Sequence, residues 1–411
     1  MAITQVRVKL GNTWTTLTYN AATGRYEASL TAPGTSIDQP GGYYSLTAEA
    51  ANSTGDTASI TGTQLPSLRL TVRETDAPSL TLSSPPAGYV TTSSPLIVFR
   101  CSDPPGGSGI DTGSGEASID GVSVPCAVSP AGTGYQLAIQ AEGLSEGPHT
   151  VTAAISDRDG NRTTASAAYI VDTVPPGLTI LRPYLRHVVD GASVVISGQA
   201  VDSVSANVSV TVGGQAVTPE EDGTFSVDFP LLVGVNSIQV SAADAAGNQT
   251  AAQVTLIRLV TDRTQADADK VADMCARGYA RWTEEERAWW ASALCLRGSY
   301  DDRDLDRVGM AVALLTEELA MRGVSVSTSP KTDWTETDTP VKSQMAVYRN
   351  NVAAIRDSQD VESMSAMPLP DSMEKLDLTG ANQLERVLVA ADALFPNYSA
   401  WTSGEITCGG G

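Results

Sequence analysis

The chain has 411 residues, which is enough for several domains that each bury a core. Its formal net charge of −21 excludes a partner held mainly through nucleic-acid phosphates, because such binding needs clustered Lys and Arg. Only two histidines occur, His149 and His187, so histidine-based metal sites and histidine-driven acid–base catalysis have few candidate residues.

The sequence shows no pattern typical of secretion or of a membrane-spanning segment. The start, MAITQVRVKL, lacks the basic and apolar stretches of a secretory signal, and no apolar run reaches the roughly 20 residues that span a bilayer. We therefore expect a chain that is made and kept in solution, or exported by cell lysis, without membrane insertion.

One pattern occurs three times in residues 1–260, as GYYSLTAEAANSTGD, GPHTVTAAISDRDGN and GVNSIQVSAADAAGN. A glycine opens each run and a second glycine closes it thirteen residues later, at Gly55, Gly160 and Gly247. Apolar residues alternate with polar ones in between, which predicts a half-buried strand. Glycine with an Asn or Asp neighbour is typical of a tight hairpin turn.

Further strands should follow these turns, for example at Ala165–Val171 and Ala252–Ile257. The closing glycines are 105 and 87 residues apart. A period of this length with many short strands predicts Ig-type β-sandwiches. We place them at residues 1–74 (module 1), 75–173 (module 2) and 174–260 (module 3).

Proline-containing segments separate the modules, RETDAPSLTL at Arg73–Leu82 and VDTVPPGLTI at Val171–Ile180. Proline fixes φ, removes an amide donor and favours extended geometry in the residue before it. Such joints are short and semi-rigid, so the modules are expected to line up as a stalk.

The composition changes near residue 261. Of the 47 acidic and 26 basic residues, 22 and 11 lie in residues 1–260, so charge is about twice as dense in residues 261–411. Ala, Leu, Glu and Arg also become more frequent there, which favours helices. Thr283 with Glu286 predicts a capping box, and a helix should begin near Asp301 and end at Gly323. We expect a helical domain at residues 261–326.

Three stripes of apolar residues spaced three and four apart follow: Leu305, Val308, Val312, Leu315, Leu319; Met345, Tyr348, Val352, Ile355; and Ala381, Leu384, Leu388, Ala391, Phe395. They are too short for a lone coiled coil and suit a small bundle, either within one chain or, less favoured, across an oligomer interface.

Residues 327–411 are expected to combine linkers, further helices and an extended tail. Ser327–Pro340 and Ser363–Ser372 are rich in Ser, Thr and Pro and read as linkers or extended arms, one of which could lie on a neighbouring subunit. The closing WTSGEITCGGG is expected to be a tail.

Calcium is the first chemistry that the sequence suggests, at DRDGN. An EF-hand loop counted from Asp157 fails, because Arg162 stands at the glycine position and Ala168 at the final glutamate position. The sister turns lack the paired acids, so we predict a solvated hairpin at Asp157 and Asp159, with no metal and a melting temperature that calcium leaves nearly unchanged.

A second acid-rich loop spans Ser102–Gly121 and holds Asp103, Asp111 and Asp120, but nothing in their spacing forces them together. An ordinary loop between strands is the favoured interpretation. Cys101 and Cys126 could form a disulfide within one module, but buried free thiols are the favoured alternative.

No pattern of a catalytic site emerges. His149 lies in a predicted strand, which favours a structural role, and a nucleophile elbow or a phosphate loop is missing. Trp282, Trp289 and Trp290 are spaced for core packing rather than for sugar stacking. Carboxylate pairs stay open as an alternative, because 47 acids allow many pairings. We predict no catalytic, cofactor-binding or metal-binding residues.

The modules with their DTVPPGLTI joints and AADAAGN turns resemble bacterial and phage Ig-like domains. Together with YNAATGRYEASLTAPGTSIDQPGGYYSLTAEA, VTDRTQADADKVADMCARGYARWTEEERAWW, GSYDDRDLDRVGMAVALL and KTDWTETDTP, they are similar to Ig-like-domain structural proteins encoded in tail regions of phages and prophages of Firmicutes. The resemblance implies a non-enzymatic virion protein of the tail tip, baseplate or tail fibre, assembled in the host cytoplasm.

Its expected partners are other tail or baseplate proteins, further copies of the chain and a glycan or protein of the host surface, with no cofactor. A bacterial surface adhesin and a cell-wall hydrolase with Ig-like accessory modules are the alternatives.

Overall fold

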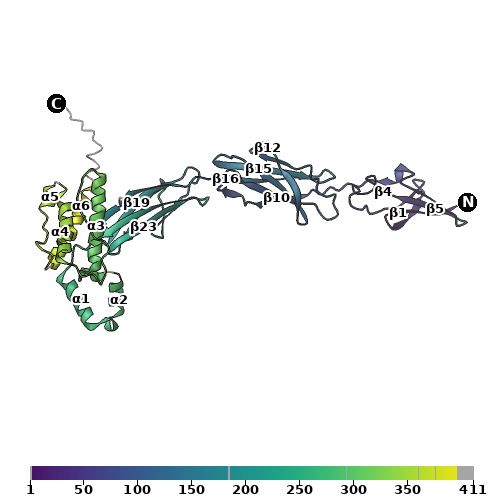
Figure 1. Cartoon of the computed structure of the whole chain (residues 1–411). Coiled ribbons are helices and arrows are strands. Elements are labelled where there is room, and N and C mark those ends of the chain that lie inside the picture. The colour runs from purple at the N-terminus through teal and green to yellow at the C-terminus, as the bar shows by residue number, and fades with distance from the viewer. Residues whose placement is uncertain (1, 184–185, 293, 360, 375, 396–411) are drawn as a thin grey trace, which may run out of the picture. The chain divides into compact units, whose positions relative to one another are not determined.

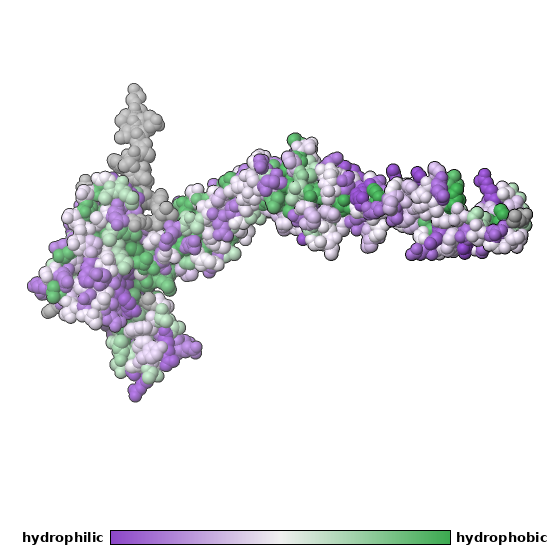
Figure 2. Space-filling view, turned by 45° about the vertical axis from the view of Figure 1, so that its right-hand side comes forward, coloured by the Kyte–Doolittle hydropathy of each residue, from purple (hydrophilic) through white to green (hydrophobic). Residues whose placement is uncertain are grey.

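The computed structural model describes residues 2–183, 186–292, 294–359, 361–374 and 376–395. It divides into two compact units, residues 1–173 and 174–411. Strands make up the first unit and the start of the second, and helices follow (Figure 1). Figure 2 shows polar and apolar residues interleaved over the visible faces of both units. Within the described residues, no helix has the length and apolar character needed to cross a membrane.

Module 1 is a five-stranded antiparallel sheet with a two-stranded ribbon. The sheet has the order β3-β2-β1-β5-β6, and β4 pairs with β7 in the ribbon. The strands are β1 (Ile3–Leu10), β2 (Thr13–Asn20), β3 (Arg25–Glu27), β4 (Tyr44–Ser45), β5 (Thr47–Asn52), β6 (Thr57–Thr61) and β7 (Arg69–Leu70). Val8, at 8% exposure, is the one apolar side chain in residues 2–74 that is buried, so this module has a thin core.

The first repeat departs from the strand that its sequence predicts. Tyr44, Leu46 and Ala48 were expected to share the inward face of one strand, but all three are only half-buried. The N–H of Leu46 donates to the Leu68 carbonyl and the Leu46 carbonyl accepts from the Gly62 N–H. The chain therefore passes from the ribbon to the sheet at Leu46, which divides the expected strand into β4 and β5.

Module 2 is a sandwich of two sheets. A four-stranded sheet, β13-β14-β10-β8, faces a five-stranded one, β12-β11-β15-β16-β9, in which β16 and β9 run parallel. A single apolar core fills the space between them. The strands are β8 (Ser79–Ser84), β9 (Gly88–Val90), β10 (Leu96–Ser102), β11 (Glu116–Ile119), β12 (Val122–Val124), β13 (Ala127–Ala131), β14 (Gly134–Gln140), β15 (Gly147–Ser156) and β16 (Arg162–Val171).

Module 3 repeats this architecture with fewer strands. Its sheets have the orders β17-β19-β22 and β18-β24-β23-β20-β21 and enclose a second core. The strands are β17 (Gly177–Arg182), β18 (Arg186–Val189), β19 (Ser193–Val201), β20 (Ser209–Val212), β21 (Gln215–Val217), β22 (Thr224–Pro230), β23 (Gly234–Ala243) and β24 (Gln249–Arg258).

The period-two pattern of the repeats is confirmed in modules 2 and 3. Val151, Ala153 and Ile155 on β15 are fully buried, and the matching residues Ile238, Val240 and Ala242 on β23 are 3% exposed or less. The closing glycines have φ of 87° at Gly55 and 97° at Gly160 and Gly247. This left-handed conformation is one that glycine adopts without steric cost, as the turn prediction required.

In the described residues after module 3 there are six α-helices: α1 (Gln265–Arg277), α2 (Glu284–Ala291), α3 (Asp302–Met321), α4 (Lys342–Asp357), α5 (Glu362–Ser365) and α6 (Leu378–Ala393). The predicted capping box is present at the start of α2, where Thr283 and Glu286 bond reciprocally. Asp301 is the N-cap of α3, and Gly323 with a φ of 82° follows its end, as predicted.

The three apolar stripes form a bundle within the chain, which confirms the favoured interpretation. Residues of α3, α4 and α6 share one core. That core also includes Val188 of β18 and Ile257 of β24, and Leu259 after it. Module 3 and the helices are thus one packed body, which the predicted boundary near residue 261 did not anticipate.

The two predicted linkers are more ordered than their composition suggests. Trp334, in the first, is 6% exposed and its backbone N–H donates to Asp306 Oδ1 of α3 at 2.7 Å, so this segment lies on the bundle of its own chain. The second begins within the short helix α5, where Met364 is 2% exposed. The closing WTSGEITCGGG, with Cys408, lies outside the described residues.

Candidate functional site

The turns that close the repeats in modules 2 and 3 have the same hydrogen bonds. Asn161 donates from its backbone N–H to Asp157 Oδ1 at 2.9 Å and from Nδ2 to Asp157 Oδ2 at 2.7 Å. Asn248 and Asp244 repeat both bonds at 2.9 Å. The sequence D-x-x-G-N thus encodes an aspartate that is held by the asparagine four residues later.

Module 1 has the same turn with the two residues exchanged. The Asp56 N–H donates to Asn52 Oδ1 at 3.0 Å, and Asn52 Nδ2 donates to Asp56 Oδ2 at 3.1 Å. This turn is exposed, whereas Asp157 is 2% exposed and Asp244 is 8% exposed. The prediction of a solvated hairpin is therefore wrong for Asp157, because tertiary packing covers its turn.

Module 1 and the segment after it cover that turn. Asp159 Oδ2 accepts from the Thr35 hydroxyl at 2.5 Å and from the Glu74 N–H at 3.0 Å. Asn161 Nδ2 also donates to the Glu74 carbonyl at 3.1 Å. Hydrogen bonds to a carboxylate are stronger than those between neutral groups. The DRDGN turn is therefore the joint between modules 1 and 2, for which the sequence had suggested the proline segment alone.

An exposed ion pair adds to this joint. The Arg158 guanidinium lies 2.6 Å from Asp38 Oδ1, with 43% and 64% of the two side chains exposed. Exposed pairs of this kind contribute about 0–1 kcal/mol. The carboxylate hydrogen bonds of Asp159, rather than this pair, are expected to hold the joint.

Three carboxylates meet beside the same turn, from Glu74, Asp103 and Asp157, with oxygen atoms within 4.8 Å of one another. Asp103 Oδ2 accepts from the Gly109 N–H at 2.8 Å, and the Ser108 N–H donates to Glu74. Burial raises the pKa of Asp103, and the neighbouring carboxylates raise it further. The donor set consists of hard oxygen atoms, which suits an alkaline-earth cation and not a thiophilic metal.

The three aspartates of the Ser102–Gly121 loop lie in different environments. Asp103 belongs to the carboxylate cluster, Asp111 accepts from the Gly113 N–H at 3.0 Å within its own turn, and Asp120 contacts His149. The loop therefore does not gather its acids into one site.

Both histidines pair with aspartates. His149 Nδ1 lies 2.7 Å from Asp120 Oδ2 and its Nε2 lies 2.8 Å from the Ser145 carbonyl oxygen. Burial lowers the pKa of His149, but these two partners raise it by more. His187 Nδ1 contacts the buried carboxylate of Asp392, whose pKa is raised by burial. Both ring nitrogens of His149 thus have partners within the protein.

Two cysteines and three tryptophans that the sequence singles out can also be placed. Cys101, at 2% exposure, and Cys126 are free thiols, so the alternative of a disulfide between them is wrong. Trp282 is 8% exposed and its Nε1 donates to the Met274 carbonyl at 2.7 Å. Trp289 and Trp290 pack against a small core cluster. Core packing, and not an exposed sugar platform, is confirmed for this group.

A buried network of four charges links the exit of module 3 to the bundle. Arg263 Nη2 lies 2.8 Å from Asp304 Oδ1 of α3 and 2.6 Å from Glu385 Oε1 of α6. Arg307 contacts the same two carboxylates, at 2.5 and 2.8 Å. All four side chains are 2% exposed or less. Sequence reasoning missed this network, since its members lie far apart in the chain and are ordinary surface residue types.

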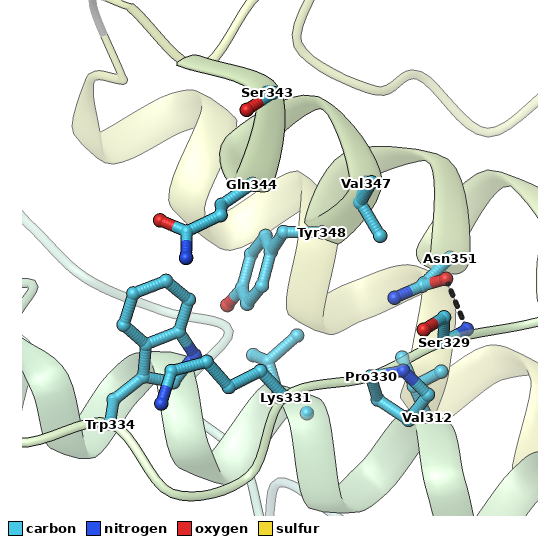
Figure 3. Close-up of a pocket in the computed structure, with 12 residues that line it drawn as sticks. Val312, Ser329, Pro330, Lys331, Trp334, Ser343, Gln344, Val347, Tyr348 and Asn351 are labelled. Atoms are coloured by element: carbon cyan, nitrogen blue, oxygen red, sulfur yellow. Dashed lines mark hydrogen bonds between the residues drawn. The ribbon is translucent and has the colours of Figure 1, made fainter. Parts of the chain in front are cut away.

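A pocket of about 260 Å³ lies between α3, α4 and residues 329–334 (Figure 3). Lys331 Nζ is placed over the Trp334 ring at 4.7 Å and pairs with Asp333. Asn351 Oδ1 accepts from the Ser329 N–H at 2.9 Å, which is the bond drawn in Figure 3. Because these polar groups serve the segment itself, the pocket offers mainly an apolar wall to a ligand.

Comparison with known proteins gives a family match for one of the modules. Residues 176–259, which are module 3, match the family model of glucodextranase, domain B. The chain carries Ig-like modules. It is a multidomain protein of tandem Ig-like β-sandwiches followed by a helical region. No curated protein matches the sequence.

Three solved structures illustrate the Ig-like and fibronectin-like neighbours. The fibronectin(III)-like modules of Clostridium thermocellum CbhA are 18% identical, over 44% of this chain and 94% of that one, with a TM-score of 0.31. The titin I-band fragment I67–I69 is 13% identical, over 62% of this chain and 87% of that one, with a TM-score of 0.30. The eight N-terminal Ig domains of the Down syndrome cell adhesion molecule are 16% identical, over 63% of this chain and 33% of that one, with a TM-score of 0.33. These likenesses concern the fold alone.

Proposed function

We propose that this chain is a non-enzymatic structural protein of a phage virion, in the tail tip, baseplate or a tail fibre. In this proposal the Ig-like modules form a stalk or contact the host surface, and the helical region docks to other tail proteins or to further copies of the chain. The placement in a virion rests on the sequence resemblance to phage tail proteins.

The observation that carries the structural role is the bonded joint between modules 1 and 2. Asp159 accepts hydrogen bonds from the Thr35 hydroxyl and from the Glu74 backbone N–H, so module 2 is bonded to a loop of module 1 and to the segment between the modules. A flexible tether needs no such bonds. A spacer that keeps two attachment points at a fixed separation needs such hydrogen bonds, because it must resist bending.

The engagement of His149 supports a role without catalysis. A general base needs a free ring nitrogen within reach of its proton donor. Asp120 and the Ser145 carbonyl occupy both nitrogens of His149. The histidine therefore fixes the start of β15 rather than offering a base to a substrate.

The match of module 3 to a glucodextranase domain favours a second candidate, a cell-wall hydrolase with Ig-like accessory modules. Incubation of the pure full chain with purified bacterial cell wall separates the two candidates. Release of sugar or peptide identifies the enzyme and contradicts the structural proposal.

Immunoelectron microscopy of purified particles tests the placement directly. Antibody raised against the full chain should label one feature of the tail, and particles from a strain in which the gene is deleted should show no label. Failure to label any tail feature, or labelling of the surface of uninfected cells instead, contradicts the virion proposal, and the second result indicates an adhesin.

A further inference from the structure

The pocket between α3 and α4 has an apolar wall that continues to the surface (Figure 3). Val308 and Val312, on α3, are 0% and 1% exposed, and the buried rings of Trp334 and Tyr348 add aromatic surface. Val347 also lines the pocket and is 45% exposed. A pocket of about 260 Å³ with this wall has room for a compact apolar group.

Asn351 directs an unused hydrogen-bond donor into this pocket. The residue is 7% exposed, and its Oδ1 accepts from the Ser329 N–H at 2.9 Å. Because that bond fixes the oxygen, the Nδ2 of the same amide points to the opposite side, into the pocket (Figure 3). No residue in the described part of the chain accepts from Nδ2. Buried amide groups almost always have hydrogen-bond partners, so this donor favours a ligand that carries an acceptor.

Two more donors lie at the other end of the pocket. Gln344 Oε1 accepts from the Val341 N–H at 3.0 Å, which leaves Nε2 on the side of Trp334 (Figure 3). The Trp334 Nε1 is buried and has no acceptor within the described residues. The two amide oxygens are already engaged, and so is the Tyr348 hydroxyl, which bonds Tyr300 at 2.6 Å. The pocket therefore suits a ligand that is rich in acceptors and poor in donors.

The charges beside the pocket favour a neutral ligand. Lys331 Nζ lies 2.7 Å from Asp333 Oδ1 and 3.4 Å from Asp338 Oδ2. One ammonium group thus faces two carboxylates, and the whole chain has a net charge of −21. A carboxylate ligand would meet negative charge here, whereas a carbonyl oxygen accepts the same hydrogen bonds without that repulsion.

We propose that this pocket binds a proline-containing extended segment of a partner chain. Proline has no backbone N–H, and its ring is an apolar group for the aromatic wall, so it offers acceptors without donors. Gln344 and Asn351 are seven positions apart on α4, about 10 Å along the helix. Carbonyls three residues apart in a polyproline II helix are about 9 Å apart, since that helix rises about 3.1 Å per residue. Two carbonyls of one such turn therefore match the two amides.

This binding rests on the docking role proposed above for the helical region, and it gives the docked partner a chemistry. The two can fail separately. A pure chain that does not bind proline peptides contradicts the role of the pocket, whereas particles without antibody label contradict the placement in a virion.

Calorimetric titration of the full chain with N-acetyl-hexaproline amide tests the pocket. Gln344→Glu and Asn351→Asp keep the oxygen that accepts the backbone N–H and replace the free amide nitrogen by a second oxygen. Each should weaken binding about tenfold, because two acceptors then face each other. Gln344 is exposed, so its variant tests the donor without disturbing the core. Asn350→Asp, on the same helix but not in the pocket wall, makes the same change of charge and should bind like the original protein.

The indole N–H signal of Trp334 in a proton–nitrogen correlation spectrum locates the bound peptide. Trp334→Phe assigns this signal among those of the six tryptophans. It should shift on addition of hexaproline and stay in place with a capped Gly-Ala peptide of equal length, which has N–H donors and no ring.

Four results would overturn the proposal: no binding of hexaproline, equal binding of the Gly-Ala peptide, equal affinity in the original and both variants, or an unmoved Trp334 signal. Binding of 4-methylpentanoate without binding of hexaproline would also overturn it and would assign the pocket to a small apolar acid.

Discussion

Asn161 holds Asp157 with two hydrogen bonds, from its backbone N–H to Oδ1 at 2.9 Å and from its side-chain Nδ2 to Oδ2 at 2.7 Å. The same Nδ2 reaches the Glu74 carbonyl of the preceding segment at 3.1 Å. One amide thus fixes a buried carboxylate and a joint between modules.

Asn161→Ala is therefore expected to destabilise module 2 by about 1–3 kcal/mol, because it leaves a buried carboxylate oxygen without its donor. Native-state hydrogen exchange of β15 and β16 in the full chain measures the effect. Asn52→Ala, which removes the asparagine of the corresponding exposed turn in module 1, serves as the control and should cost less than about 1 kcal/mol in its own module. Equal losses in the two modules would contradict the role of burial.

Thr35→Val should open the joint without unfolding either module. It removes the hydroxyl that donates to Asp159 Oδ2 at 2.5 Å, and hydrogen bonds to a charged group contribute about 1.5–3 kcal/mol. Because 1.4 kcal/mol corresponds to a factor of ten, native cleavage by trypsin after Arg73 should accelerate at least about tenfold. The exposed Thr31→Val is the control, and an unchanged rate in Thr35→Val would show that Asp159 does not hold the joint.

Arg263→Met should destabilise the second unit by about 3–5 kcal/mol, since it leaves Asp304 and Glu385 buried with Arg307 alone. Five of the six tryptophans lie after residue 260, so tryptophan fluorescence during urea unfolding reports on this unit.

Arg303→Met, on α3, is the matched control for that substitution. Its partner is the half-exposed Asp301, and the expected loss is about 0–1 kcal/mol. A urea midpoint of Arg263→Met equal to that of Arg303→Met would mean that the buried charges do not stabilise the unit.

The second unit should lose stability in acid through Glu385. Burial raises the pKa of Glu385, but Arg307 and Arg263 lower it by more, so the folded-state pKa lies below the ordinary 4.5. As the pH falls, Glu385 therefore binds a proton in the unfolded chain before it does so in the folded one. The stabilisation that ionised Glu385 contributes is complete above pH 4.5 and is lost as the pH falls through the folded-state pKa.

Urea midpoints measured from neutral pH downward check this sign. Glu385→Gln should start from a lower midpoint and lose less of it in acid than the original protein. Glu374→Gln, in an exposed pair with Lys342, should follow the original curve. A steeper acid loss in Glu385→Gln than in the original would contradict the assignment.

Gly309→Ala should destabilise the bundle although alanine is the better helix former. A methyl group at this buried position of α3 would overlap the carbonyl oxygen of Lys331, where residues 329–334 cross the helix. Overpacking costs about 1–3 kcal/mol, more than the gain of about 1 kcal/mol in helix propensity. Urea unfolding of the second unit measures the net loss, and a stabilised variant would show that the segment does not press on the helix. Gly177→Ala, with 3.6 Å to its nearest neighbour, should be close to neutral.

Several elements could be predicted from local sequence. The repeats gave the buried faces of β15 and β23, and the Thr283 capping box marked the start of α2, because periodicity and capping depend on residues within a few positions of one another. The three apolar stripes predicted an intrachain bundle for the same reason. In module 1 the pattern failed at Leu46, where pairing with Leu68 divides the strand.

The candidate site could not be predicted in this way. Asp157 read as a solvated turn residue, since nothing local indicates that Thr35 and Glu74 would fold over its turn. Glu74 and Asp103 are separated by 29 positions from each other, and Asp103 and Asp157 follow strands of different sheets, so only the tertiary packing brings the three together. The network of Arg263, Asp304 and Glu385 likewise consists of residue types that are mostly found at surfaces.

By itself, the sequence determined the order of three β modules and a helical region, the turns closed by Gly55, Gly160 and Gly247, and the helix ends. Each of these depends on short-range periodicity, backbone conformation or capping. Tertiary structure alone decided that the DRDGN turn is a buried joint with three carboxylates, and that module 3 and the bundle share one core. Burial and charge contacts between distant residues depend on how sheets and helices pack, which no local pattern records.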